Sequence, residues 1–114
     1  MSAHAATIGH AQPQHLKALE AANRVRVARA GLKRKIADGQ LDVPEVILTC
    51  PWMVETMALG ELLTSQNRWG HTRARRFLQS AGLGETKLLS TLTERQRLTL
   101  AALLSAKRYS HQES

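Results

Sequence analysis

Arginines gather in the stretch NRWGHTRARRFLQSAGL, residues 67–83, in a pattern that suits the binding of phosphate groups. Arg68 lies in a short turn ending at Gly70, and three more arginines follow in an expected helix. A guanidinium can hold two phosphate oxygens at once, and the free backbone N–H groups at a helix start favour the same ligand. The stretch contains no acid that could neutralise it. The candidate residues for binding a nucleic-acid backbone here are Arg68, His71, Thr72, Arg73, Arg75 and Arg76.

The sequence contains no recognisable catalytic set. It offers no carboxylate pair, no nucleophile with a nearby base, and no glycine-rich loop with a lysine. Cys50 is the only cysteine, and the histidines lack the spacing of metal ligands. We therefore expect no enzyme activity, no cofactor, no metal site and no small-molecule substrate.

Composition points to one small domain with a polyanionic partner. The chain has 114 residues, a formal net charge of +7 and 43% hydrophobic residues, enough for one modest core. Aromatic residues make up only 4%, which is few for a protein that stacks single-stranded bases. The lone cysteine, the lack of a long apolar run and the lack of a secretory signal predict a cytoplasmic protein with no membrane partner.

The net charge is concentrated in two parts of the chain. Residues 1–38 carry +5, residues 39–67 carry −4, residues 68–76 carry +4 and residues 77–114 carry +2. Two basic blocks around an acidic one predict a basic face and an acidic face. Within the first block, Arg26, Arg29 and Lys33 are close enough in helical angle to form a second ridge along DNA.

Hydrophobic periodicity predicts an all-α fold. We expect a flexible tail at 1–12, a long basic helix at 13–38, an acidic connector with a short helix at 39–56, a helical module at 57–108 and a tail at 109–114. In the long helix, a stripe containing Leu16, Leu19 and Val27 is the expected apolar face. The connector's Trp52 is expected to fill a space between the connector and that helix.

Within the helical module, four helical segments are expected. They cover 57–66, 72–80, 85–90 and a final helix to about residue 108. Gly39 and Gly82 suit helix C-termini, and Thr93 with Gln96 forms a capping box for the final helix. For Trp69, burial in the core and contact with DNA both remain open.

This order of elements resembles the helix–two-turn–helix module of the actinobacterial (mycobacterial-type) integration host factor family. The similarity runs without gaps from about residue 57 to 104, through LGELL, NRWGHTRA, LQSAGL and TERQRLTLAALL. The long basic helix before it is also the family's arrangement. The family's turn usually reads Pro-Gly-apolar-Gly-Lys, where this chain has Asn67-Arg68-Trp69-Gly70-His71. Its second turn is Gly-Leu-Gly, where this chain has Thr91-Leu92-Thr93, which indicates a diverged or phage-encoded relative.

The resemblance implies a nucleoid-associated protein that binds double-stranded DNA, bends or compacts it, and assists site-specific recombination. It implies phosphate contacts at Trp69, Gly70, His71 and Arg73, and a second basic contact at Lys87. The expected form is a monomer. An RNA-binding module of ribosomal-protein type is the alternative, although the short, weakly basic end KRYSHQES lacks the long basic extension of that family.

Overall fold

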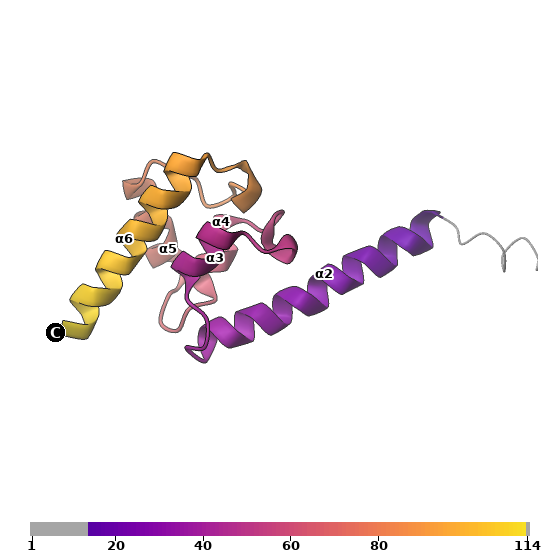
Figure 1. The fold of residues 1–114 in the computed structure, drawn as a ribbon, viewed down its shortest axis with the longest axis horizontal. Helices are drawn as coiled ribbons and strands as arrows, with labels where there is room; N and C mark the ends of the chain where they lie inside the picture. Colours follow the sequence, from indigo (N-terminus) through magenta and orange to yellow (C-terminus); the bar gives the residue numbers. More distant parts are fainter. Residues whose placement is uncertain (1–13, 114) are drawn as a thin grey trace, which may run out of the picture.

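The structure, a computed structural model, describes residues 14–113, with side chains up to residue 107. The flexible tail expected at 1–12 lies outside the described residues. The described chain is helical with no β-strand, which confirms the all-α prediction (Figure 1). Its α-helices are α2 (Gln14–Ala37), α3 (Val43–Thr49), α4 (Leu59–Thr64), α5 (His71–Ser80) and α6 (Glu94–Glu113), and its 3-10 turns are η1 (Trp52–Val54) and η2 (Leu89–Thr91).

Within the described residues, helix α2 packs on the other elements through its C-terminal part, from Arg29 onward. Its buried side chains are Leu32 and Ile36, and it packs against η1. Figure 1 shows the rest of the helix extending away from the other elements. The prediction of a buried apolar stripe was wrong, because Leu19 and Val27 are 58% and 65% exposed. The helical period of that stripe is present, but no described element covers the N-terminal half of the helix.

Two glycines end helices as the sequence predicts. Gly39 has φ +79° and Gly82 has φ +75°, a left-handed conformation that glycine adopts without a Cβ clash. After α2, the N–H of Gln40 donates to the carbonyl of Lys35 at 2.9 Å. The N–H of Leu83 donates to the carbonyl of Leu78 in the same way after α5. Both ends are Schellman motifs, which satisfy carbonyls that the helix leaves free.

The core forms where two pairs of helices meet. Helix α3 packs on α6, and α4 packs on α5. The largest fully buried side chains come from all parts of the module and the connector, among them Ile47, Met57, Leu59, Leu62, Leu63, Leu78, Leu89 and Leu100. Trp52 lies outside this core, 56% exposed, so its predicted role as a buried filler was wrong. Its position directly after Pro51 does not place the Trp52 side chain in the core.

The segment expected to form a helix at 85–90 contains no α-helix: it is a turn at 85–86, an extended residue at Leu88 and then the start of η2. Ala58 and Leu88 form an isolated antiparallel bridge. The N–H groups of Leu59 and Gly60 donate to the carbonyls of Lys87 and Glu85, each at 2.9 Å. The segment therefore caps the N-terminus of α4, and only the short turn η2 follows it. Pairing between distant segments outweighed the local helical pattern.

The last helix begins as predicted and ends later than predicted. The N–H of Gln96 donates to Oγ1 of Thr93 at 3.1 Å, and the N–H of Thr93 donates to Oε1 of Gln96 at 2.9 Å, which confirms the capping box. Helix α6 then continues to Glu113 rather than to about residue 108. The tail expected at 109–114 is thus helical over its described part.

Candidate nucleic-acid interface

The turn between α4 and α5 is held against the end of α2. Asn67 donates from Nδ2 to the carbonyl of Ala37 at 2.9 Å, and the N–H of Trp69 donates to the carbonyl of Gln66 at 3.2 Å. Arg68, between them, has φ +68° and an exposed side chain. This left-handed conformation costs free energy in any residue other than glycine. The turn therefore fixes an exposed guanidinium on a strained backbone.

Helix α5 begins at this turn with an uncapped N-terminus. Gly70 is the N-cap residue, and no side chain caps the helix. The first turn contains no acid, and His71, Thr72 and Arg73 are exposed. Gly70 itself has φ −87°, and a Cβ placed there would meet nothing within 4 Å. The geometry of Gly70 therefore does not require glycine, whereas that of Arg68 favours it.

Trp69 stands between the core and the cations of α5. Its ring meets Phe77 edge-on, with centroids 5.5 Å apart and an interplanar angle of 87°. The guanidinium carbon of Arg73 lies 4.1 Å from the centroid of the Trp69 ring. An arginine over an indole face gains cation–π and stacking energy, which orders the side chain. Trp69 is half-buried against the core, and the face of its ring supports the guanidinium of Arg73.

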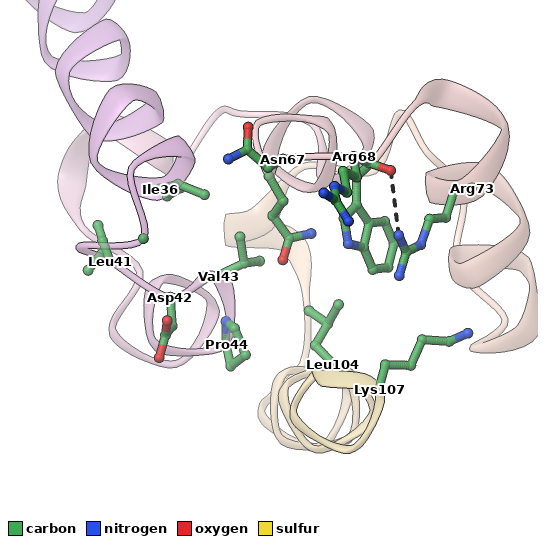
Figure 2. A pocket seen from close by; sticks show the side chains of 13 residues that line it. Ile36, Leu41, Asp42, Val43, Pro44, Asn67, Arg68, Arg73, Leu104 and Lys107 are labelled. Atoms are coloured by element: carbon green, nitrogen blue, oxygen red, sulfur yellow. Dashed lines mark hydrogen bonds between the residues drawn. The ribbon is translucent and has the colours of Figure 1, made fainter. Parts of the chain in front are cut away.

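Two adjoining hollows bring the cations of this region together. The first is about 280 Å³ in volume and is lined by Arg68, Arg73 and Lys107 along one side, as Figure 2 shows. The second is bounded by Arg73, Arg76 and Lys107, with Thr72 and Ser80 between them. Arg73 and Lys107 border both. We call Arg68, Arg73, Arg76 and Lys107 the α5 cationic cluster.

Lys107 is the member of the α5 cationic cluster that sequence reasoning missed. It comes from α6, and its Nζ lies 5.9 Å from the centroid of the Phe77 ring. The only signal in the sequence is its position three residues after the buried Leu104, at the edge of the packed face of α6. The packing of Phe77 near α6 then brings it beside α5. That pairing joins residues thirty positions apart and follows from the tertiary fold.

Other candidate residues lie apart from the α5 cationic cluster. Arg75 faces Glu85, with Nε and Oε1 3.8 Å apart, and lines neither hollow. Lys87 lies in the segment that caps α4, and it also lines neither hollow. Both residues lie on the side of the module that pairs with residues 57–60.

The ridge expected on α2 is also divided. Arg29 donates from Nε to the carbonyl of Met53 at 2.7 Å and from Nη2 to Oγ1 of Thr56 at 2.5 Å. Lys33 forms an ion pair with Glu61, with Nζ and Oε2 2.6 Å apart. These two residues therefore fasten α2 to the connector and to α4. Arg26 is exposed on the projecting part of the helix.

The chemistry available at the cluster is the binding of anions. Arg68 and Arg73 lie at the N-terminal end of α5, where the helix dipole is positive, and Arg76 and Lys107 extend the cationic surface along the helix. The described residues contain no group of three or more His, Cys, Asp or Glu side chains that could hold a metal ion. Among the described helices, none is long and apolar enough to cross a membrane. Comparison of the chain with protein-family models, with curated proteins and with solved structures found no match.

Proposed function

We propose that this protein binds double-stranded DNA through the phosphate backbone and acts as an architectural protein. The observation that carries the proposal is that the α5 cationic cluster lines two adjoining hollows beside α5, a helix whose N-terminus has no side-chain cap. Arginines grip phosphate oxygens in pairs, and helix N-termini accept them through backbone N–H groups. Contacts to phosphates do not distinguish one base sequence from another, so we expect the protein to bind duplexes of any sequence with similar affinity.

The order of elements supports a kinship with the actinobacterial integration host factor family, and we propose a role in the nucleoid on that ground. In such a role, the protein bends DNA and assists recombination. Bending requires contacts on more than one side of a duplex or on two arms. The exposed basic side chains on the projecting part of α2 supply a second basic surface. They include Lys17, Arg24 and Arg26.

The salt dependence of binding tests the backbone contact. Four phosphates neutralised by the α5 cationic cluster contribute about −3.6 to the slope of log K against log salt, and contacts made by α2 add to it. The double variant Arg73→Ala/Arg76→Ala should make the slope shallower by about 1.8 and weaken binding to all duplex sequences by a similar factor. Arg75→Ala is the matched control on the same helix, because its side chain faces Glu85, and it should leave the slope unchanged.

Four results would contradict the proposal. An affinity that is flat between low and moderate salt would exclude the phosphate contact. A double variant that binds like the unmodified protein would exclude the α5 cationic cluster. A structured RNA that displaces duplex DNA at a much lower concentration would favour an RNA-binding module. Energy transfer between dyes at the two ends of a bound duplex then measures bending, and an unchanged transfer would exclude it.

A further inference from the structure

The first hollow beside the α5 cationic cluster has two walls of different character. Figure 2 shows Arg68, Arg73 and Lys107 on one side, and Ile36, Leu41, Val43 and Pro44 on the other. Leu104 lies between them. A duplex backbone would engage the cations but would leave the apolar wall uncovered, since paired bases stay stacked inside the helix. The hollow therefore has a surface that contact with phosphates alone does not use.

The apolar wall ends in a group that accepts hydrogen bonds. Gln66 donates from Nε2 to the carbonyl of Leu63 at 3.1 Å, which fixes its amide and leaves Oε1 as an acceptor in the hollow. A ligand that fits must therefore combine an anion at one end, an apolar body, and an N–H or O–H donor for this acceptor. Fatty acids lack the donor, and inorganic phosphate lacks the apolar body.

We propose that this hollow holds one unstacked nucleotide, with its phosphate on Arg68, Arg73 and Lys107 and its base against the apolar wall. This inference rests on the proposed function and adds an extrahelical nucleotide to it. The volume of about 280 Å³ suits a ligand smaller than drug size.

Tryptophan fluorescence tests the hollow directly. The chain has two tryptophans, and Trp52 is exposed on η1, so Trp52→Phe leaves Trp69 as the only reporter. Deoxyadenosine monophosphate should quench Trp69 in a saturable manner, whereas inorganic phosphate should not. Equal quenching by both would overturn the base contact. An oligoglutamate peptide that displaces the nucleotide and binds more tightly would overturn the assignment in favour of an acidic peptide.

A bulged duplex tests the same site in the context of DNA. A duplex with one bulged adenosine should bind at least about five-fold more tightly than the same duplex with an abasic residue in the bulge, the gain expected from burying one base against apolar side chains. The abasic duplex keeps the flexibility of the bulge, so it isolates the base. Equal affinity for both would overturn the inference, while a steep salt slope on fully paired DNA would still support the proposed function.

Two substitutions separate the nucleotide from the backbone contact. Gln66→Leu should abolish the preference for the bulged base and leave the affinity for paired DNA unchanged. Arg76 lines only the second hollow. Arg76→Ala should therefore weaken the binding of paired DNA and keep the preference for the bulged base. Leu41→Gln, on the loop before α3, is a second variant if Gln66→Leu unfolds. A preference that survives in the folded variants would overturn the proposal.

Discussion

Replacing Arg68 by glycine should raise the stability of the protein and lower its affinity for DNA. Arg68 has φ +68°, and an L-residue in this conformation costs about 1–2 kcal/mol relative to the right-handed region. Glycine avoids that cost but loses about 0.5–1 kcal/mol through the greater freedom of the unfolded chain. The net gain in the free energy of unfolding should be about 0.5–1 kcal/mol, which raises Tm by a few degrees in a domain of this size.

Arg68→Ala is the matched control for this prediction, because it removes the same guanidinium and keeps a Cβ. Its free energy of unfolding should stay close to that of the unmodified protein. Both variants should reduce the salt slope of DNA binding by about 0.9, the loss of one phosphate contact. Thermal unfolding followed by circular dichroism measures the first effect, and a fluorescence binding assay measures the second. If glycine proves no more stable than alanine, the strain assigned to this turn is refuted.

Two further substitutions test the placement of neighbouring residues. Gly70→Ala should change the free energy of unfolding by less than about 0.5 kcal/mol, because φ is −87° and no atom blocks the added Cβ; a large loss in chemical denaturation would refute this geometry. Arg29→Ala should cost about 1–3 kcal/mol by removing the hydrogen bonds to Met53 and Thr56, without changing the salt slope. A reduced slope for Arg29→Ala would instead place its guanidinium on DNA.

Local signals in the sequence located the bounds of α2 and the starts of α5 and α6. The bounds of α2 follow from its period and from Gly39, and the capping box of Thr93 and Gln96 marks the start of α6. These features depend on residues within one or two turns of each other. The start of α5 is predicted on the same basis, since the turn at Gly70 precedes it directly.

Features that depend on distant residues were not predictable in this way. The segment 85–88 pairs with residues before and within α4, so its own helical pattern did not decide its structure. Arg29 contacts Thr56 on the connector, 27 positions away, and Lys33 contacts Glu61 on α4, 28 positions away. Because of these contacts, neither side chain forms part of the expected ridge. Lys107 joined the candidate site for the same kind of reason. Side-chain type alone did not distinguish a structural cation from a ligand-binding one.

The attachment of α2 by one end has a consequence for its electrostatics. Lys17 lies about 25 Å along the helix from Arg34, at a rise of 1.5 Å per residue. At physiological ionic strength, the field of an exposed charge is screened over about 8 Å. The charges at the free end of α2 and those at its anchored end, next to the turn held by Asn67, therefore do not sense one another through solvent. Each group attracts its own counterions, and the charges at the two ends of α2 act independently of each other.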